Sequence, residues 1–252
     1  MQYDLSILGF IAEDEKIISP SQSPQRALGG GIVYGAFAIA HYNPNFQLNL
    51  VTKVGESFNL RSYSFFNKQD CNTIKIIRTS PHTTHYKLDY TEDPRQLRLI
   101  HKALPFHYDE IPSSFWNTKV VLLTPIAQDF SEEFLQNLPR FIHPSSFLGI
   151  DIQGLLRNFQ SDGKIHLNCS PPLIHTFKVL CEQMGSRLFL KMDLQEAYAF
   201  SNTRSLSETI AFCQKLSVHI FITMGLKGLY AISPQFGVQF YPSVVPNEIT
   251  DE

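Results

Sequence analysis

The chain alternates short, wholly apolar segments with longer amphipathic ones. Six apolar runs, each bounded by polar or turn-forming residues, predict buried strands at 3–10, 48–54, 119–124, 147–150, 187–191 and 218–223. Helix-like segments separate them, among them residues 32–41 and the stretch "SEEFLQNL". Apolar strands that alternate with helices predict one mainly parallel sheet with helices on both faces, which is a three-layer α/β/α fold.

The segment 73–101 has a different pattern from the rest of the chain. Its sequence, "TIKIIRTSPHTTHYKLDYTEDPRQLRLIH", alternates apolar and polar residues, with turn-forming residues between the runs. A period of two is typical of antiparallel strands that have one face in water. We therefore predict a small antiparallel sheet that projects from the main one.

Composition narrows the class of protein. The 252 residues suit one large α/β domain or two small ones, and a hydrophobic content of 43% is enough for a packed core. The net charge of −2, without a basic stripe, argues against a nucleic-acid-binding protein. The longest apolar stretch, residues 31–40, is about half a membrane span, and the first residues have no signal-peptide pattern. We expect a soluble, cytoplasmic protein that binds neither membrane nor nucleic acid. We also expect four free thiols, at Cys71, Cys169, Cys181 and Cys213.

Two groups of residues near the start of the chain could bind a polar ligand. Gly29, Gly30 and Gly31 directly precede a predicted helix, where free backbone N–H groups suit polar or anionic groups and glycine permits close approach. A plain tight turn is the alternative. Asp14 follows the first strand, at the edge where open α/β sheets bind ligands, and could accept hydrogen bonds from sugar hydroxyls. Here the alternative is a solvated acid in the charged sequence "EDEK".

Two further motifs follow the later strands. Asp193 and Glu196, in "KMDLQEA", would lie on one face at the start of a helix. They could hold a hydrated Mg²⁺ beside phosphates, or they could be ordinary N-terminal helix charges. "TMGLKG", with Thr223, Gly225 and Gly228, predicts a tight glycine turn, most simply that of a hairpin.

The order of these motifs is more specific than any one of them. Gly9 and Asp14, the three glycines, "VTKVGES", "GIDIQGLLR", "KMDLQEA" and "ITMGLKG" follow one another as in the ribokinase-like carbohydrate kinases, the group of ribokinase, fructokinase and adenosine kinase. The sequence resembles this family along essentially its whole length. The resemblance implies one ribokinase-like domain over residues 1–252, with a β-lid at about 12–28 and 72–104. "GIDIQGLLR" departs from the commoner Asp-Pro-Asn-x-Arg and is closer to a variant in some inositol-kinase-like members.

The resemblance also implies roles for individual residues. Asp14 would accept the substrate hydroxyl, with Gly29, Gly30, Gly31 and Tyr34 beside it, although Tyr34 stands where many members have Asn. Asp193 and Glu196 resemble the Asn-x-x-Glu motif that organises Mg²⁺ and phosphate through water, with Asp in place of Asn. The implied nucleotide-binding residues are Lys191, Thr223, Gly225 and Gly228. The implied cofactors are ATP and Mg²⁺, with a monovalent cation as a further one.

The last residues bear on the expected activity. In this family a Thr-Gly-Ala-Gly-Asp segment holds the transferred phosphoryl group and supplies the catalytic Asp, and it follows an approach like "PNEITDE". The resemblance implies that this Asp lies beyond Glu252, so that residues 1–252 alone are a truncated and inactive form, or else a naturally short chain.

Two classes of function remain open. We expect the intact protein to transfer phosphoryl from ATP to a hydroxyl of a sugar, polyol, inositol or nucleoside, with the lid as a candidate homodimer contact. The alternative is a non-catalytic sugar- or nucleotide-binding or regulatory protein on the same scaffold.

Overall fold

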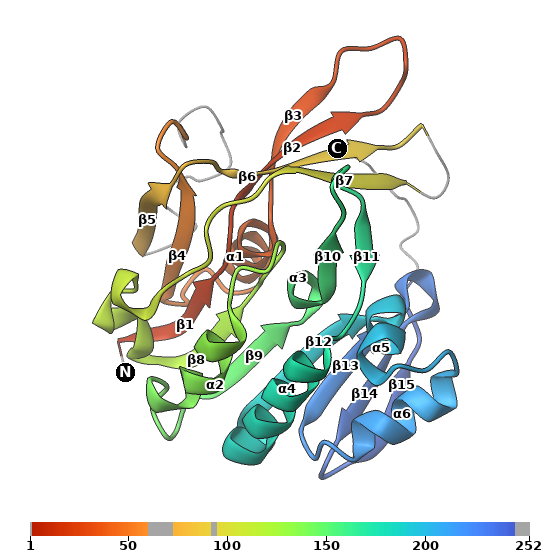
Figure 1. Ribbon diagram of the computed structural model, residues 1–252. Helices are drawn as coiled ribbons and strands as arrows, with labels where there is room; N and C mark the ends of the chain where they lie inside the picture. Colours follow the sequence, from red (N-terminus) through yellow and green to blue (C-terminus); the bar gives the residue numbers. More distant parts are fainter. Residues whose placement is uncertain (1, 60–72, 92–94, 245–252) are drawn as a thin grey trace.

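The computed structural model describes residues 2–59, 73–91 and 95–244, and it shows a large twisted sheet with a smaller sheet above one end (Figure 1). The large sheet has nine strands in the order β15-β14-β13-β12-β9-β8-β1-β4-β5. Neighbouring strands from β13 to β5 are parallel, and the hairpin of β14 and β15 adds an antiparallel edge. The strands are β1 (Tyr3–Leu8), β4 (Leu48–Gly55), β5 (Thr73–Ser80), β8 (Thr118–Leu123), β9 (Phe147–Asp151), β12 (Leu188–Asp193), β13 (His219–Thr223), β14 (Leu229–Ser233) and β15 (Gly237–Tyr241). All six predicted strands are present in this sheet, so the prediction of a mainly parallel α/β fold is confirmed.

The smaller sheet, which we call the lid, has four strands in the order β3-β2-β6-β7. They are β2 (Ala12–Ile17), β3 (Gln25–Gly29), β6 (Thr84–Asp89) and β7 (Gln96–His101). The pairs β2/β3 and β6/β7 are antiparallel, whereas β2 and β6 are parallel. The lid thus joins two segments that are far apart in the sequence, as the resemblance implied.

One part of the lid prediction is wrong. Residues 73–80 were expected in the antiparallel sheet, but they form β5, which pairs in parallel with β4 at the edge of the main sheet. The alternating pattern of this segment comes from its edge position, because one face of β5 is exposed while the other packs on the core.

Helices lie on both sides of the main sheet, and the alternating side chains of each strand divide the core between them. Leu5 and Ile7 pack with the buried face of α1 on one side, while Leu8 belongs to the larger cluster on the other. Helices α2, α4, α5 and α6 cover that second side (Figure 1). The α-helices are α1 (Gly31–Tyr42), α2 (Glu132–Asn137), α3 (Gln153–Leu156), α4 (Pro171–Met184), α5 (Leu194–Ser201) and α6 (Leu206–Gln214).

Strands β9, β12 and β13 bear an aromatic face that no described helix covers. Their inner side chains are fully buried beneath α4 and α5, but Phe147 and Phe221 on the opposite face are 43% and 36% exposed. The ring of Phe189 stacks on that of His219, with 4.4 Å between the ring centroids, and lies beside Phe221. We call these four residues the aromatic face. Parallel strands are normally buried on both sides, so this face is unusual for its position.

A short hairpin ties the lid to the main domain. It consists of β10 (Arg157–Phe159) and β11 (Ile165–Leu167). The backbone N–H of Leu99 on β7 donates to the carbonyl of Gly163 at 2.9 Å, and Arg98 forms a bridge with Lys164. The lid is therefore held both by its own connections to the main sheet and by this hairpin.

Two smaller expectations can be compared with the described residues. Cys169, Cys181 and Cys213 are buried free thiols, as predicted, and Cys71 lies outside the described residues. Burial raises the pKa of each of the three thiols to about 12, which makes them unreactive. Within the described parts of the chain, no helix is long and apolar enough to span a membrane.

Candidate functional site

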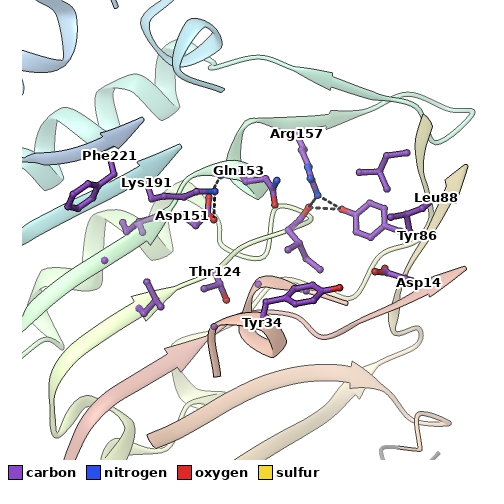
Figure 2. Close-up of a pocket in the computed structure, with 18 of the residues that line it drawn as sticks. Asp14, Tyr34, Tyr86, Leu88, Thr124, Asp151, Gln153, Arg157, Lys191 and Phe221 are labelled. Carbon is purple, nitrogen blue, oxygen red and sulfur yellow. Dashed lines mark hydrogen bonds and ion pairs between the residues drawn. The ribbon is translucent and has the colours of Figure 1, made fainter. Parts of the chain in front are cut away.

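A cavity of about 720 Å³ opens between the lid and the carboxyl ends of the parallel strands. Its walls come from lid strands β2, β6 and β7, the first turns of α1, residues of β8, β9, β12 and β13 or directly after them, and the segment of α3 and β10. The strand order changes direction between β1 and β8, and ligands of open α/β sheets bind at such a switch point. Figure 2 shows labelled side chains from β2, β6, α1 and the strand ends around one space.

Asp14 is the buried acid of this cavity. It lies on β2, is 9% exposed, and receives no hydrogen bond from any described residue. Burial raises the pKa of its carboxyl to about 6, although the positive charges of Lys16, Arg95 and Arg157 act in the opposite direction. A buried carboxylate without a donor is costly, so its geometry suits a ligand that brings the donor. The alternative of a solvated acid in "EDEK" does not fit this burial.

The space around residues 29 and 30 is too small for any side chain, so both positions require glycine. A Cβ added at Gly29 would be 2.0 Å from Oδ2 of Asp14, and one at Gly30 would be 2.4 Å from the carbonyl oxygen of Phe10. Gly30 is also the N-cap of α1, with a φ of 101°, which side chains other than glycine rarely adopt. It offers no side-chain cap, and both Gly30 and Gly31 line the cavity, so the start of α1 forms part of the cavity wall.

Thr124, which the sequence analysis did not single out, lies beside these glycines. Its Oγ1 is buried and has no hydrogen-bond partner among the described residues, although the residue lines the cavity. It is packed between Gly9 and Gly31, whose added Cβ atoms would be 2.4 Å from Oγ1 and 2.8 Å from its Cβ, respectively. The signal in the sequence was a polar residue directly after the apolar strand "KVVLL", at the ligand-binding edge of the sheet.

Tyr34 lies on the part of the cavity wall that α1 forms. It projects from α1, is 54% exposed, and lies across from Arg157 and Tyr86 (Figure 2). Its phenol can both donate and accept hydrogen bonds, which differs from the amide that many similar kinases would place there.

An ion pair stands at the other end of the cavity. Lys191 Nζ is 3.0 Å from Oδ2 of Asp151, and the two residues are register partners on β12 and β9. Lys191 was predicted as a nucleotide-binding residue, whereas Asp151 was not. Asp151 could have been found from its place at the end of a buried strand, in "GIDIQ".

Two arginines are anchored to tyrosines in the cavity wall. Arg157 donates through Nη1 to the carbonyl of Ile126 at 3.0 Å and to the hydroxyl of Tyr86 at 3.4 Å (Figure 2). Arg95 donates through Nη1 to the hydroxyl of Tyr90 at 3.2 Å. Each guanidinium also lies over the ring of its tyrosine, 5.6 Å and 5.4 Å from the ring centroid, respectively. The sequence analysis noted Arg157 only within a motif and missed Arg95, because no spacing in the sequence brings them together.

Asp193 and Glu196 form a reciprocal helix cap. The N–H of Glu196 donates to Asp193 Oδ1 at 2.8 Å, and the N–H of Asp193 donates to Glu196 Oε2 at 2.7 Å. Glu196 is 2% exposed, and burial raises its pKa. Neither residue lines the cavity, and the described residues contain no cluster of three or more His, Cys, Asp or Glu that could hold a metal. The local geometry therefore accounts for both carboxylates as a capping box, and their part in Mg²⁺ binding stays a prediction.

The glycine turn at 223–228 is a hairpin turn, as the simplest interpretation had it. Thr223 ends β13, and the N–H of Met224 donates to the carbonyl of Gly228 at 2.8 Å across the turn. Gly225 and Gly228 both have positive φ angles. None of the predicted turn residues lines the cavity, so their nucleotide-binding role also stays a prediction.

Comparison with known proteins gives a fold and no close relative. No protein-family model matches the sequence, and no curated protein sequence matches it either. Among solved structures, a pyrophosphate-dependent kinase of the ribokinase family matches with a TM-score of 0.76 and 21% identity, over 94% of this chain and 78% of that chain. Ribokinase from Arabidopsis thaliana, complexed with ribose and ATP, matches with a TM-score of 0.67 and 14% identity, over 100% of this chain and 81% of that chain. A nucleoside kinase from Methanocaldococcus jannaschii matches with a TM-score of 0.64 and 16% identity, over 100% of this chain and 79% of that chain.

Proposed function

We propose that this chain, which has the fold of the ribokinase-family kinases, binds a polyhydroxylated small molecule beneath its lid for phosphorylation. The acceptor would be a hydroxyl of a sugar, polyol, inositol or nucleoside. The donor would be ATP, although the similar pyrophosphate-dependent kinase, solved with a pyrophosphate analogue and myo-inositol, makes pyrophosphate the second candidate.

One observation carries this proposal, which is that the cavity presents unpartnered polar groups of complementary kinds. The carboxylate of Asp14 can only accept while it is ionised, and the hydroxyl of Thr124 can both donate and accept. At the start of α1, the N–H groups of Gly31 and Ile32 are donors that bind no described residue. A compound with several neighbouring hydroxyls satisfies all three, because each hydroxyl donates one hydrogen bond and accepts others.

The reaction we propose is an in-line phosphoryl transfer. The acceptor oxygen forms the new P–O bond, and the donor's leaving phosphate takes the electrons of the bond that breaks. The acceptor proton passes to a base, for which the resemblance implies an Asp. Within the described residues, Asp14 would orient the acceptor, and the lid over the cavity would exclude water.

The donor would occupy the end of the cavity near Lys191. Lys191 is held in place by Asp151, so that its ammonium is positioned toward that end (Figure 2). ATP would bring Mg²⁺, which neutralises phosphate charge in such reactions. Asp193 and Glu196 would bind that ion only through water, and only with the carboxylate oxygens that do not accept the capping hydrogen bonds. The monovalent cation that the resemblance implies has no assigned residues.

The second candidate is a non-catalytic binding or regulatory protein on the same scaffold. It is supported by the same cavity, because the described lining residues supply binding groups for a polyol. The two candidates share a ligand and differ in turnover.

Binding and turnover should therefore be measured separately. Calorimetric titration with ribose, fructose, myo-inositol and adenosine would be run on the protein and on its Asp14→Asn variant, with Glu15→Gln as the matched control. Glu15 neighbours Asp14 on β2 but pairs with Lys87 outside the cavity. We expect one ligand class to bind, with a loss of about 10-fold or more in Asp14→Asn and no change in Glu15→Gln. Equal binding by both variants would remove Asp14 from the site. Acceptor-dependent release of ADP or phosphate would then distinguish the kinase from the binding protein.

A further inference from the structure

The cavity carries more positive than negative charge. Its charged side chains are two acids and four bases, Asp14, Asp151, Lys16, Arg95, Arg157 and Lys191. Lys191 is paired with Asp151. This leaves Lys16, Arg95 and Arg157 with Asp14 as the single remaining acid, so that positive charge exceeds negative charge by two within the described lining.

Among the described residues, these three bases have no acidic ion-pair partner. None of them forms an ion pair with a described residue, although other lysines of the chain do, including Lys87 on the neighbouring lid strand. A plain solvated surface would explain free bases, but these converge on one cavity from three separate segments, β2, the residue before β7, and the start of β10. Convergence from separate elements is what a binding site requires.

Both arginines are also oriented in the same manner. Each uses Nη1 for its hydrogen bonds to tyrosine or backbone oxygen, and each is supported by the face of that tyrosine. Within the described residues, Nε and Nη2 of each guanidinium make no hydrogen bond. An arginine that is fixed through one nitrogen and free at its remaining edge is arranged for bidentate binding of a carboxylate or a phosphate.

We propose that the acceptor bound in this cavity is itself anionic, a polyhydroxylated compound with a phosphate or carboxylate group that Arg157, Arg95 and Lys16 hold. Asp14 binds a hydroxyl of the same molecule. This inference rests on the proposed function, since it places the anion on the acceptor and leaves the donor phosphates to the end of the cavity at Lys191. The neutral sugars and inositol would then be weak ligands.

The experiment compares compounds that differ only in the charged group, without any donor present. The pairs are ribose and ribose 5-phosphate, fructose and fructose 6-phosphate, myo-inositol and inositol 1-phosphate, and glucose and gluconate. Calorimetry on the whole chain should show at least one anionic member that binds about 30-fold or more tightly than its neutral partner. The phosphate and carboxylate pairs distinguish the two sources of negative charge.

Variants assign the effect to the arginines. In Arg95→Gln, which is exposed and so does not endanger folding, the preference for the anionic member should fall to about threefold or less. Arg157→Gln should do the same if it stays folded. Arg98→Gln is the matched control, since Arg98 lies on β7 next to the cavity-lining Leu97 but outside the cavity, and it should keep the full preference.

The outcomes separate this inference from the proposed function. Equal affinity for neutral and anionic partners would overturn the anionic acceptor and leave the polyol site intact. The binding of inorganic phosphate, pyrophosphate and ATP is measured in the same way. If Arg95→Gln weakened the binding of these donors alone, the arginines would belong to the donor, and the inference would be wrong. Binding of no polyol of either kind would overturn both proposals.

Discussion

The carboxylate of Asp14 occupies the space that a side chain at residue 29 would need. A Cβ at Gly29 would be 2.0 Å from Oδ2 and 2.5 Å from Cγ of Asp14. The two residues lie on adjacent antiparallel strands of the lid, so the glycine permits the acid to face the cavity.

This relationship predicts the result of a double-mutant cycle. Gly29→Ala should displace the Asp14 carboxylate, weaken polyol binding by about 10-fold or more, and destabilise the fold by roughly 1–3 kcal/mol. In an Asp14→Ala background the same alanine should cost clearly less stability, because the obstructing carboxylate is gone. Denaturant unfolding of the four proteins measures the coupling. Additive effects would show that Gly29 is needed for another reason.

The buried Asp14 also predicts a dependence of stability on pH. Its pKa is about 6 in the folded protein, against 3.8 for the ordinary side chain, so the folded state favours the protonated form. The stability that the neutral form confers is fully present below pH 3.8 and is lost as the pH rises through 6. Asp14→Asn should therefore be more stable than the parent by roughly 1–3 kcal/mol at pH 7–8, with little difference near pH 4.

Thermal or urea unfolding of both proteins at pH 4, 6 and 8 gives this difference. The comparison cancels the contribution of Asp129, which is fully buried and whose pKa burial also raises. A less stable Asp14→Asn at pH 8 would mean that a group of the protein itself holds the carboxylate.

Replacing Thr124, directly after β8, should affect stability and binding differently from replacing Thr118, the first residue of β8. Thr124→Val removes an unpartnered buried hydroxyl, so stability should stay within about 0.5 kcal/mol or rise, while polyol affinity falls. Thr118→Val removes a hydroxyl that donates to backbone oxygens at 3.1 Å and 3.4 Å, and it should lower stability by about 1 kcal/mol without touching the cavity. The hypothesis fails if Thr124→Val costs as much as Thr118→Val and binds ligand normally.

The capping box gives a test of the two interpretations of Asp193. Asp193→Ala should lower stability by about 1 kcal/mol, and Asp193→Asn by much less, since Asn also caps helices. A cap alone makes these effects independent of Mg²⁺. If millimolar Mg²⁺ with ATP raised the melting temperature of the parent but not of Glu196→Gln, the pair would have the metal-organising role that the resemblance implies.

The aromatic face should contribute less to folding than the buried face of the same strands. Phe221→Ser removes a side chain that is 36% exposed and that lines the cavity, so it should lower stability by about 1 kcal/mol or less. Ile222→Ser, one residue along β13 and fully buried on the opposite face, should instead destabilise the fold by about 3 kcal/mol or more. Urea unfolding measures both losses, and equal losses in the two variants would show that the aromatic face is packed as tightly as the buried one.

The main sheet could be predicted from the sequence because continuous apolar runs leave few alternatives to buried parallel strands. The misplacement of residues 73–80 shows the limit, since an edge strand and a lid strand have the same alternating pattern. Asp14 and the glycines could be found because they follow recognisable elements. Arg95, Thr124 and Asp151 could not be assigned together, because only the folded lid and the adjacent strand ends bring them to one cavity. A capping box and a metal-organising pair both use acidic residues at the spacing found in "DLQE". The spacing alone therefore could not distinguish these two roles of Asp193 and Glu196.

The hairpin of β10 and β11 has a consequence for kinetics. Arg157 begins this hairpin and is bonded to the loop after β8 through Ile126, while the far end of the hairpin is bonded to β7 of the lid. Any motion that lifts β7 must therefore either pull the hairpin, and Arg157 with it, or break the contact between Leu99 and Gly163. We expect the hydrogen bond from the Leu99 amide to Gly163, followed by hydrogen exchange, to break at the same rate at which a bound molecule leaves the cavity. Replacing Gly163, whose added Cβ would be 2.3 Å from the carbonyl oxygen of Leu99, should speed both processes by the same factor.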